Sequence, residues 1–414
     1  MLGLILSRLV QQGTLTVVWP SGDASVYGSG APRATIRLKG RFTPWRIAFN
    51  PELAFGETYM DGRLTVPSGT IADVLEILIS NMGRDRAPAI TRLERAFRRC
   101  LRVISQFNPA GRARKNVAHH YDLSGKLYDL FLDSDRQYSC AYFSEPKMSL
   151  EAAQLAKKRH IAAKLNLDRP GLKVLDIGSG WGGLALDLAR DGKADVLGIT
   201  LSTEQLGLAN TRAQSAGLSE RCRFELEDYR EVKGEFDRIV SVGMFEHVGV
   251  NHYDAFFAKI AELLAPDGVA LLHTIGRTDQ PGATNPWIAK YIFPGGYTPS
   301  LSEVAAAVER HRLYVTDVEV LRLHYAETLK EWRMRFLRNR VKAAALYDER
   351  FCRMWEFYLA GAEMTFRHDR LVVFQIQLAR QVDALPITRD YMLESERTMR
   401  FGATERGPRA HEAA

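Results

Sequence analysis

From about residue 150 onward, short apolar runs alternate with longer amphipathic stretches. The runs predict strands at Lys173–Ile177, Ala194–Ile199, Arg223–Leu226, Phe236–Val242 and Val269–Thr274. The stretches between them have the periodicity of helices, one of which follows a glycine-rich turn directly after the first strand. Strand–helix alternation of this kind builds a Rossmann-like, doubly wound α/β sheet that binds ligands at the carboxyl ends of its strands.

The first hundred residues have a different pattern, typical of a small mixed α/β domain. Leu15–Trp19 and Ala34–Lys39 alternate as strands do, and Thr70–Asn81 has the spacing of an amphipathic helix. A second helix is expected at Pro88–Phe107, with five arginines among its non-apolar positions. Such a helix suits an anionic lipid surface, and it equally suits an ordinary solvated face on its own domain.

These patterns divide the chain into two domains and a tail. We expect an N-terminal domain at residues 1–107, a linker rich in Gly, Arg and Lys at 108–118, and a larger domain at 119–384. Residues 385–414 are polar and without periodicity, which predicts a disordered tail.

Charge is distributed unevenly between these parts. Residues 1–120 hold 17 Lys and Arg against 8 Asp and Glu, whereas the remainder holds 39 against 41. The basic N-terminal part predicts a polyanionic partner, either nucleic acid or an anionic membrane surface. The four cysteines lie far apart and have no metal-ligand spacing, and no apolar run is long enough to span a bilayer. We therefore expect a cytoplasmic protein with free thiols.

The turn after the first predicted strand carries the most specific local signal. Gly178, Gly180 and Gly183 formally fit the G-x-G-x-x-G pattern of dinucleotide-binding enzymes. However, Asp176 lies inside the strand, where methyltransferases orient the methionine end of S-adenosylmethionine. The second strand ends at Thr200 rather than at the acid that holds a nicotinamide ribose. The pattern therefore favours a class I S-adenosylmethionine-dependent methyltransferase, although a dinucleotide enzyme stays open.

Several further motifs make a family resemblance specific. They are His120–Leu123, Tyr138–Phe143, Leu175–Gly183, Ser241–Gly249, Leu272–Gly276 and Ile292–Gly296. Over residues 115–380 the sequence resembles the cyclopropane-fatty-acyl-phospholipid synthases and the related mycolic acid cyclopropane synthases. Over residues 1–110 the similarity is looser and is carried by Gly56–Gly62. The chain has Gly178-Ser179-Gly180 where bacterial members usually have Gly-Cys-Gly.

The resemblance implies two sets of site residues. Those that hold S-adenosylmethionine are Tyr138, Ser139, Asp176, Gly178, Gly180, Thr200, Gln205, Asp228 and Tyr229. Those that hold a bicarbonate ion beside the transferred methyl group are Cys140, Glu246, His273, Ile275 and Tyr325. No metal is expected, because Glu246 and His247 have no third ligand at suitable spacing.

The resemblance also implies a reaction and a set of partners. The resemblance implies transfer of a methylene unit to the cis double bond of a phospholipid acyl chain, through a carbocation that bound bicarbonate deprotonates. A relative that gives methylene- or methyl-branched chains is the alternative, and a nucleic-acid methyltransferase is a more distant one. The resemblance further implies a homodimer on the inner face of the cell membrane, with the small N-terminal domain binding lipid and no nucleic acid bound.

Overall fold

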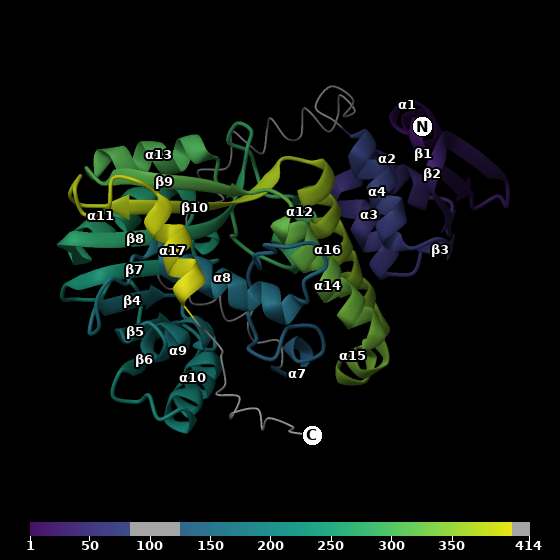
Figure 1. Ribbon diagram of the computed structural model, residues 1–414. Coiled ribbons are helices and arrows are strands. Elements are labelled where there is room, and N and C mark those ends of the chain that lie inside the picture. The colour runs from purple at the N-terminus through teal and green to yellow at the C-terminus, as the bar shows by residue number, and fades with distance from the viewer. Residues whose placement is uncertain (83–124, 400–414) are drawn as a thin grey trace, which may run out of the picture.

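The computed structural model describes residues 1–82 and 125–399 (Figure 1). The predicted helix Pro88–Phe107, the linker at 108–118 and the His120–Leu123 motif lie outside the described residues.

A seven-stranded sheet forms the larger domain, with the strand order β6-β5-β4-β7-β8-β10-β9. Five neighbouring strands are parallel, whereas β10 pairs antiparallel with both β8 and β9. The strands are β4 (Lys173–Ile177), β5 (Asp195–Thr200), β6 (Cys222–Leu226), β7 (Phe236–Val242), β8 (Leu264–Arg277), β9 (Tyr314–Leu321) and β10 (Leu371–Ala379). Each of the five predicted strands overlaps one of these, and the predicted α/β class I methyltransferase fold is confirmed.

Helices cover both faces of this sheet because its strands are apolar on both sides. Val174 packs with α8 (Leu150–Lys164), α9 (Gly183–Arg190) and α10 (Thr203–Ser215). The next residue, Leu175, packs on the opposite face with α11 (Tyr253–Leu263) and α13 (Leu301–Arg310). The glycine turn between β4 and α9 therefore opens at the carboxyl edge of the sheet, where parallel strands bind ligands.

Within residues 1–82, the N-terminal domain consists of a three-stranded antiparallel sheet and four helices. Its elements are α1 (Leu2–Leu9), β1 (Gln12–Val18), β2 (Ala24–Leu38), α2 (Thr43–Phe49), α3 (Pro51–Met60), β3 (Leu64–Ser68) and α4 (Ile71–Asn81). Thr70 and Asp73 form a capping box at the start of α4, which accounts for the predicted helix at Thr70–Asn81. The two predicted strands fall within β1 and β2, apart from their last residues.

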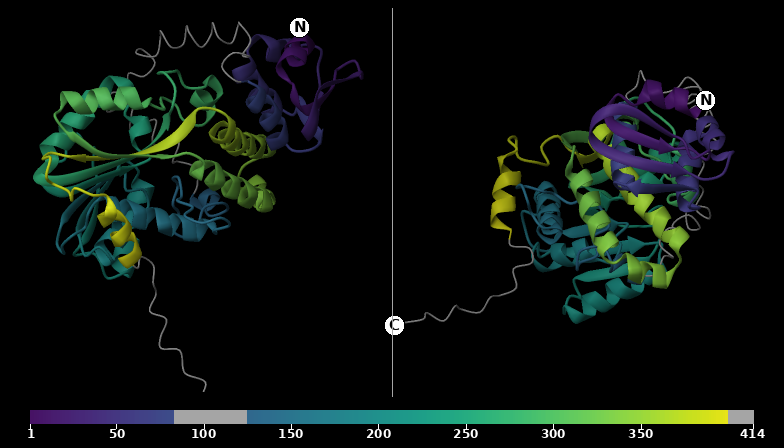
Figure 2. Two further views of the ribbon diagram at one scale, coloured as in Figure 1. Left: turned by 45° about the horizontal axis from the view of Figure 1, so that its top comes forward. Right: turned by 90° about the vertical axis from the view of Figure 1, so that its right-hand side faces the viewer.

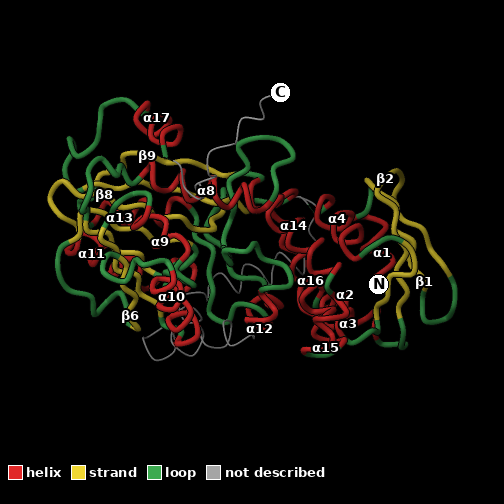
Figure 3. The backbone as a smooth tube through the Cα atoms, turned by 60° about the horizontal axis from the view of Figure 1, so that its bottom comes forward, coloured by secondary structure: helices red, strands yellow, loops and turns green. Residues whose placement is uncertain are grey.

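A layer of helices separates the two sheets. Figure 3 shows α14 (His324–Arg338) and α16 (Glu349–His368) between them, with α15 (Arg340–Leu346) at one end. Helix α16 belongs to both cores: Ala360 and Met364 pack in the N-terminal core, whereas Trp355 and Leu359 pack in an aromatic core of the larger domain. Figure 2 shows the same layer from two further sides.

A second contact between the domains involves α3 and α12 (Pro286–Tyr291). Gly56 lies so close to Trp287 that a Cβ atom would come within 2.5 Å of its Nε1. Met60 Sδ accepts a hydrogen bond from the same nitrogen at 3.3 Å. Part of the Gly56–Gly62 motif is thereby explained as an interface between domains.

The predicted disordered tail contains a helix, so that prediction is wrong for part of the segment. Helix α17 spans Asp390–Thr398 and packs against α8, as Figure 1 shows. Met392 is its one buried residue, and Glu396 contacts His160 of α8. A helix held by one apolar side chain and by polar contacts leaves no apolar periodicity in the sequence.

No helix in the described part of the chain has both the length and the apolar character needed to cross a membrane.

Candidate active site

The turn after β4 is built from glycines in left-handed conformations. Gly178, Gly180 and Gly182 have φ angles of 82°, 55° and 82°, which L side chains rarely adopt. A Cβ atom on Gly178 would lie 2.9 Å from Cβ of Met244, whereas one on Gly180 would meet open space. No side chain shields the Gly180 backbone from the pocket that it lines, and helix α9 begins three residues later at Gly183.

This pocket contains six of the nine residues predicted to hold the methyl donor. They are Gly178, Gly180, Thr200, Gln205, Asp228 and Tyr229. The space inside the pocket, counting its open mouth, is about 800 Å³. Thr200 Oγ1 donates to Gln205 Oε1 at 2.8 Å, so the end of β5 is tied to the first turn of α10.

The carboxylate of Asp228 is buried and forms a two-pronged ion pair with Arg230. The guanidinium donates through Nε at 2.8 Å and through Nη2 at 2.5 Å. Because each carboxylate oxygen can accept more than one hydrogen bond, this pair leaves Asp228 able to accept from an adenine amine. Arg230 also lines the pocket, and the sequence patterns did not single it out.

The remaining three residues of that set, Tyr138, Ser139 and Asp176, do not line this pocket. Asp176 is buried, and burial raises the pKa of its carboxyl to about 7, while nearby Lys157 acts in the opposite direction. Tyr138 donates to or accepts from the hydroxyl of Tyr358 at 3.2 Å, and Ser139 Oγ accepts from Lys157 Nζ at 2.8 Å.

Glu246 and Ile275 are brought together at the end of β8. The backbone N–H of Ile275 donates to Glu246 Oε1 at 2.5 Å. The Ile275 N–H, which was predicted to donate to a bound ion, thus donates in this structure to the Glu246 carboxylate. Glu246 Oε2 is buried and has no hydrogen-bond partner within residues 1–82 and 125–399. Burial raises the pKa of Glu246 to about 7, against the effect of the Ile275 N–H.

His273 lies on the same strand, two residues before Ile275. Gln375 of β10, directly opposite in the register, donates through Nε2 to His273 Nδ1 at 3.1 Å. Burial lowers the pKa of His273 to about 3, so the ring is neutral at pH 7. With Nδ1 accepting, the ring proton resides on Nε2, which makes that nitrogen a hydrogen-bond donor.

Cys140 and Tyr325 lie with Ile275 in the aromatic core. The Trp332 ring stacks on Tyr138 at 5.1 Å and meets Tyr325 edge-on at 5.8 Å. Tyr138 and Tyr325 therefore flank a common tryptophan. Burial holds the pKa of the Cys140 thiol well above its usual range, so the sulfur stays protonated and is no nucleophile.

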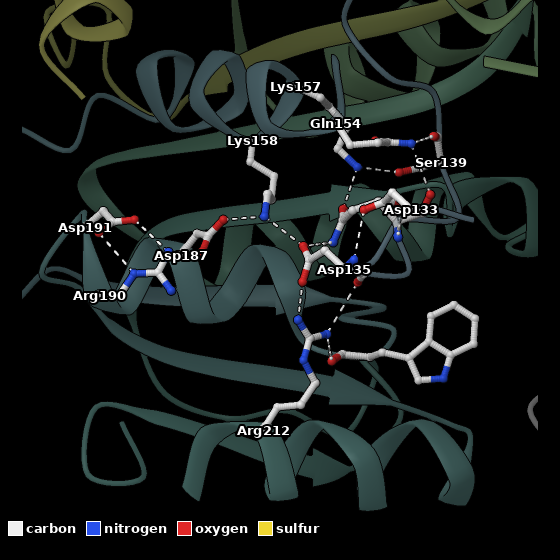
Figure 4. A network of polar contacts seen from close by, with 12 residues as sticks. Asp133, Asp135, Ser139, Gln154, Lys157, Lys158, Asp187, Arg190, Asp191 and Arg212 are labelled. Atoms are coloured by element: carbon white, nitrogen blue, oxygen red, sulfur yellow. Dashed lines mark hydrogen bonds and ion pairs between the residues drawn. The ribbon is translucent and has the colours of Figure 1, made fainter. Parts of the chain in front are cut away.

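Lys157 is the main residue that the sequence patterns missed. It is buried on α8 and donates to Gln137 Oε1 at 2.5 Å and to Ser139 Oγ at 2.8 Å (Figure 4). Burial lowers the pKa of its amine to about 8, with Asp133 the strongest opposing charge. Its charge also acts on the pKa of Asp176, Cys140 and His273. One buried amine thus lies near members of both predicted site sets.

An ionic network fixes the loop that carries Tyr138, Ser139 and Cys140 (Figure 4). Asp135 accepts from Lys158 of α8 at 2.7 Å and pairs with Arg212 of α10. Lys158 also pairs with Asp187 of α9. Three helices around the glycine turn therefore meet at one loop. These contacts join residues far apart in sequence and leave no local pattern to recognise.

The arrangement fits the methyl donor implied by the sequence. Bare backbone at Gly180, polar groups at Thr200, Gln205 and Asp228, and the Tyr229 ring offer contacts for a nucleoside with a charged amino-acid end. In the part of the chain described, no three His, Cys, Asp or Glu side chains gather as a metal site.

Comparison with known proteins shows the family to which the chain belongs. The family model described as mycolic acid cyclopropane synthetase matches residues 109–376, and a domain of unknown function matches residues 3–84. The chain is 38% identical over 364 residues to the cyclopropane-fatty-acyl-phospholipid synthase of Escherichia coli, covering 87% of this chain and 91% of that protein. It is 36% identical over 391 residues to the tuberculostearic acid methyltransferase UfaA1 of Mycobacterium tuberculosis, covering 91% and 90%.

Solved structures give the same result. The cyclopropane synthase MmaA2 from Mycobacterium tuberculosis matches 66% of this chain and 99% of its own, with a TM-score of 0.62 and 34% identity. The mycolic acid cyclopropane synthase CmaA1, complexed with SAH and CTAB, matches with a TM-score of 0.61 and 35% identity over the same shares. The chain therefore belongs to the family of the cyclopropane-fatty-acyl-phospholipid and mycolic acid cyclopropane synthases and is an S-adenosylmethionine-dependent methyltransferase.

Proposed function

We propose that the enzyme adds a methylene unit from S-adenosylmethionine across the cis double bond of an unsaturated acyl chain in a membrane phospholipid. The observation that carries this proposal is that Met244 and His247, on either side of Glu246 in the sequence, line the donor pocket, while Glu246 itself contacts Ile275 of the aromatic core. The Escherichia coli relative, which is named for this reaction, matches the chain over nearly its whole length.

The chemistry requires positioning and a dry pocket. S-adenosylmethionine supplies an electrophilic methyl group on a sulfonium ion. As the methyl carbon bonds to one alkene carbon, its bond to sulfur breaks, and the other alkene carbon is left as a cation. Loss of a proton from the new methyl group closes the three-membered ring. An alkene is a poor nucleophile, so the protein's main contribution is to hold the reactants in line.

The aromatic core suits this cation. Tyr325 and Trp332 are both buried and in contact, and the ring centroids of Phe366 and Tyr325 lie 4.9 Å apart. The faces of such rings carry partial negative charge and stabilise a nearby cation without reacting with it. Their burial also keeps water from adding to the cation.

Bicarbonate is our proposed base for the final proton. Glu246 Oε2 is a buried acceptor suited to the ion's O–H, and the Nε2–H of neutral His273 and the Tyr325 hydroxyl are donors for its oxygens. The chain's contribution is to hold the ion and to keep its own groups in these protonation states.

The test is incubation with labelled S-adenosylmethionine and vesicles of unsaturated phospholipid, followed by mass spectrometry and NMR of the acyl chains. We expect cyclopropane signals in place of olefinic protons, and turnover that falls when bicarbonate is removed. Glu246→Gln should still bind S-adenosylmethionine but lose about 100-fold or more in turnover. Unchanged turnover in that variant removes Glu246 from the proposed role.

A branched product is the second candidate, favoured by the match to a tuberculostearic acid methyltransferase. Such an enzyme methylates the same double bond but leaves a methylene- or methyl-branched chain. The same NMR spectrum distinguishes the outcomes, because a branched product shows methyl or exocyclic methylene signals and no cyclopropane protons.

We propose further that the enzyme is a homodimer bound peripherally to the inner face of the cell membrane through its N-terminal domain. The excess of Lys and Arg in residues 1–120 supports an anionic surface. Light scattering tests the dimer. Co-sedimentation with anionic vesicles, compared with binding to RNA, tests the membrane against the nucleic-acid alternative.

A further inference from the structure

Helix α2 of the N-terminal domain presents three large aromatic side chains to solvent. Phe42, Trp45 and Phe49 are 64%, 52% and 54% exposed. Their spacing of three and four residues places them on one side of the helix, which is called the α2 face below. The Trp45 and Phe49 rings stack with centroids 6.1 Å apart, so two of the three rings form one aromatic surface.

The fold itself does not need these rings. The opposite side of α2 supplies Ile47 and Ala48 to the core of the N-terminal domain, and Thr43 is buried with them. Thr43 Oγ1 also donates to the carbonyl of Lys39 at 2.5 Å, which fixes the start of the helix. Exposed aromatic clusters that contribute nothing to a protein's own core mark surfaces for binding.

Basic residues surround the α2 face. Arg41 places its guanidinium 4.8 Å from the Phe42 ring, and Arg46 follows Trp45 on the helix. The exposed residues Lys39 and Arg63 lie side by side, since the Lys39 N–H donates to the Arg63 carbonyl at 2.7 Å. The start of α2 is therefore positively charged.

Two neighbouring acids, Glu57 and Asp61, are bound to cations of the larger domain. Glu57 pairs with Arg46 but also with Lys290 of the larger domain at 2.7 Å. Asp61 pairs with Arg350 of the larger domain at 3.0 Å. Both carboxylates are thus already held by cations from outside the N-terminal domain.

We propose that the α2 face is the element that enters the headgroup region of an anionic phospholipid surface. This inference rests on the proposed function and names the part of the N-terminal domain that touches lipid. A helix of seven residues is too short to span a bilayer and lies in its plane. Aromatic rings favour the membrane–water boundary, and adjacent Lys and Arg side chains bind anionic headgroups.

A second copy of the chain is a poorer occupant. In a two-fold symmetric contact the same patch would face itself, so the cations Arg41 and Lys39 of one copy would lie close to those of the other. Like charges set opposite each other disfavour association. An anionic lipid surface is complementary to both the rings and the charges.

The test is co-sedimentation of the full chain with vesicles of phosphatidylglycerol and phosphatidylcholine. The combined variant Phe42→Ser, Trp45→Ser and Phe49→Ser should bind at least about tenfold more weakly. A control variant replaces three other exposed apolar residues, Val341, Val382 and Ile387, with serine and should bind as the unmodified protein does. Circular dichroism should show both variants folded.

A charge variant separates the two contributions. Lys39→Glu with Arg41→Glu should weaken binding to the anionic vesicles and reduce its dependence on the phosphatidylglycerol fraction. Unchanged vesicle binding by the aromatic variant overturns the inference. So does a change confined to its oligomeric state in light scattering, because the α2 face is then a contact between copies.

Activity assays keep this inference distinct from the proposed function. Unsaturated phospholipid dispersed in detergent micelles presents acyl chains without a bilayer. The aromatic variant should modify micellar lipid at the normal rate and vesicle lipid about tenfold more slowly at limiting lipid. If the unmodified protein alters neither substrate, the proposed function fails. If it alters both and the variant does the same, only the role of the α2 face fails.

Discussion

The carboxyl group of Glu246 affects folding as well as chemistry. Burial raises its folded-state pKa to about 7, above the ordinary value of 4.5. The folded protein therefore holds this proton more tightly than the unfolded chain does. The resulting stability is fully present below about pH 4.5 and is lost as the pH rises through about 7.

Glu246→Gln should remove this pH dependence, because an amide does not titrate. Relative to the unmodified protein, the variant's free energy of unfolding should rise by about 3 kcal/mol between about pH 4.5 and pH 7. Urea titrations at a series of pH values measure it. A constant difference between the two proteins would show that Glu246 titrates normally.

Lys157 is expected to position the loop that carries Tyr138, Ser139 and Cys140 rather than to react. Lys157→Met leaves Gln137 Oε1 and Ser139 Oγ without their buried donor. The KM for S-adenosylmethionine should then rise by about tenfold or more, with a smaller change in kcat.

Lys164→Met is the matched control on the same helix. Lys164 is also buried, but its partners are Asp317 and Glu319 of β9 rather than residues of that loop. It should lower the melting temperature with little change in that KM. Equal KM effects in the two variants would mean that Lys157 acts only through stability.

At the scale of elements, the polar helix α17 packs against its neighbours with a single buried apolar side chain. Met392 is its buried anchor, whereas the adjacent Leu393 is 54% exposed. Met392→Ala should cost about 2 kcal/mol of unfolding free energy, and Leu393→Ala about 0.5 kcal/mol or less. Thermal or urea unfolding measures both. Equal losses would contradict the observed packing.

The regular elements were the easiest to predict. The strands of the large sheet are buried on both faces, so each is a short apolar run visible in the sequence. The spacing of Ile71, Val74, Leu75 and Leu78 likewise predicted the helix α4. Helix α17 escaped prediction because its polar contacts come from distant residues, His160 and Asp317 among them.

The candidate site was predictable to the extent that its residues follow strand ends. Gly178, Thr200 and Asp228 come at or after the carboxyl ends of β4, β5 and β6, and Ile275 lies two residues before that of β8, a position that the alternating pattern itself indicates. Lys157 lies in a helix before the first strand of that sheet, where nothing in the local sequence separates it from an ordinary surface lysine.

At the scale of the whole molecule, the family motif in the N-terminal domain has a physical reason. Gly56 leaves room for Trp287, and Glu57 and Asp61 reach cations of the larger domain. Sequence similarity alone identified this stretch but not its partner, because the partner lies more than two hundred residues away.

Because helix α16 packs in the cores of both domains, the domains should stay associated without a continuous backbone between them. Ala360 and Met364 complete one core while Trp355 and Leu359 complete the other, so separation would expose apolar surface on both sides. A protease site introduced within residues 108–118 should therefore yield two fragments that co-elute in gel filtration and still methylate lipid. Fragments that drift apart would show that the backbone tether, rather than this shared helix, keeps the halves together.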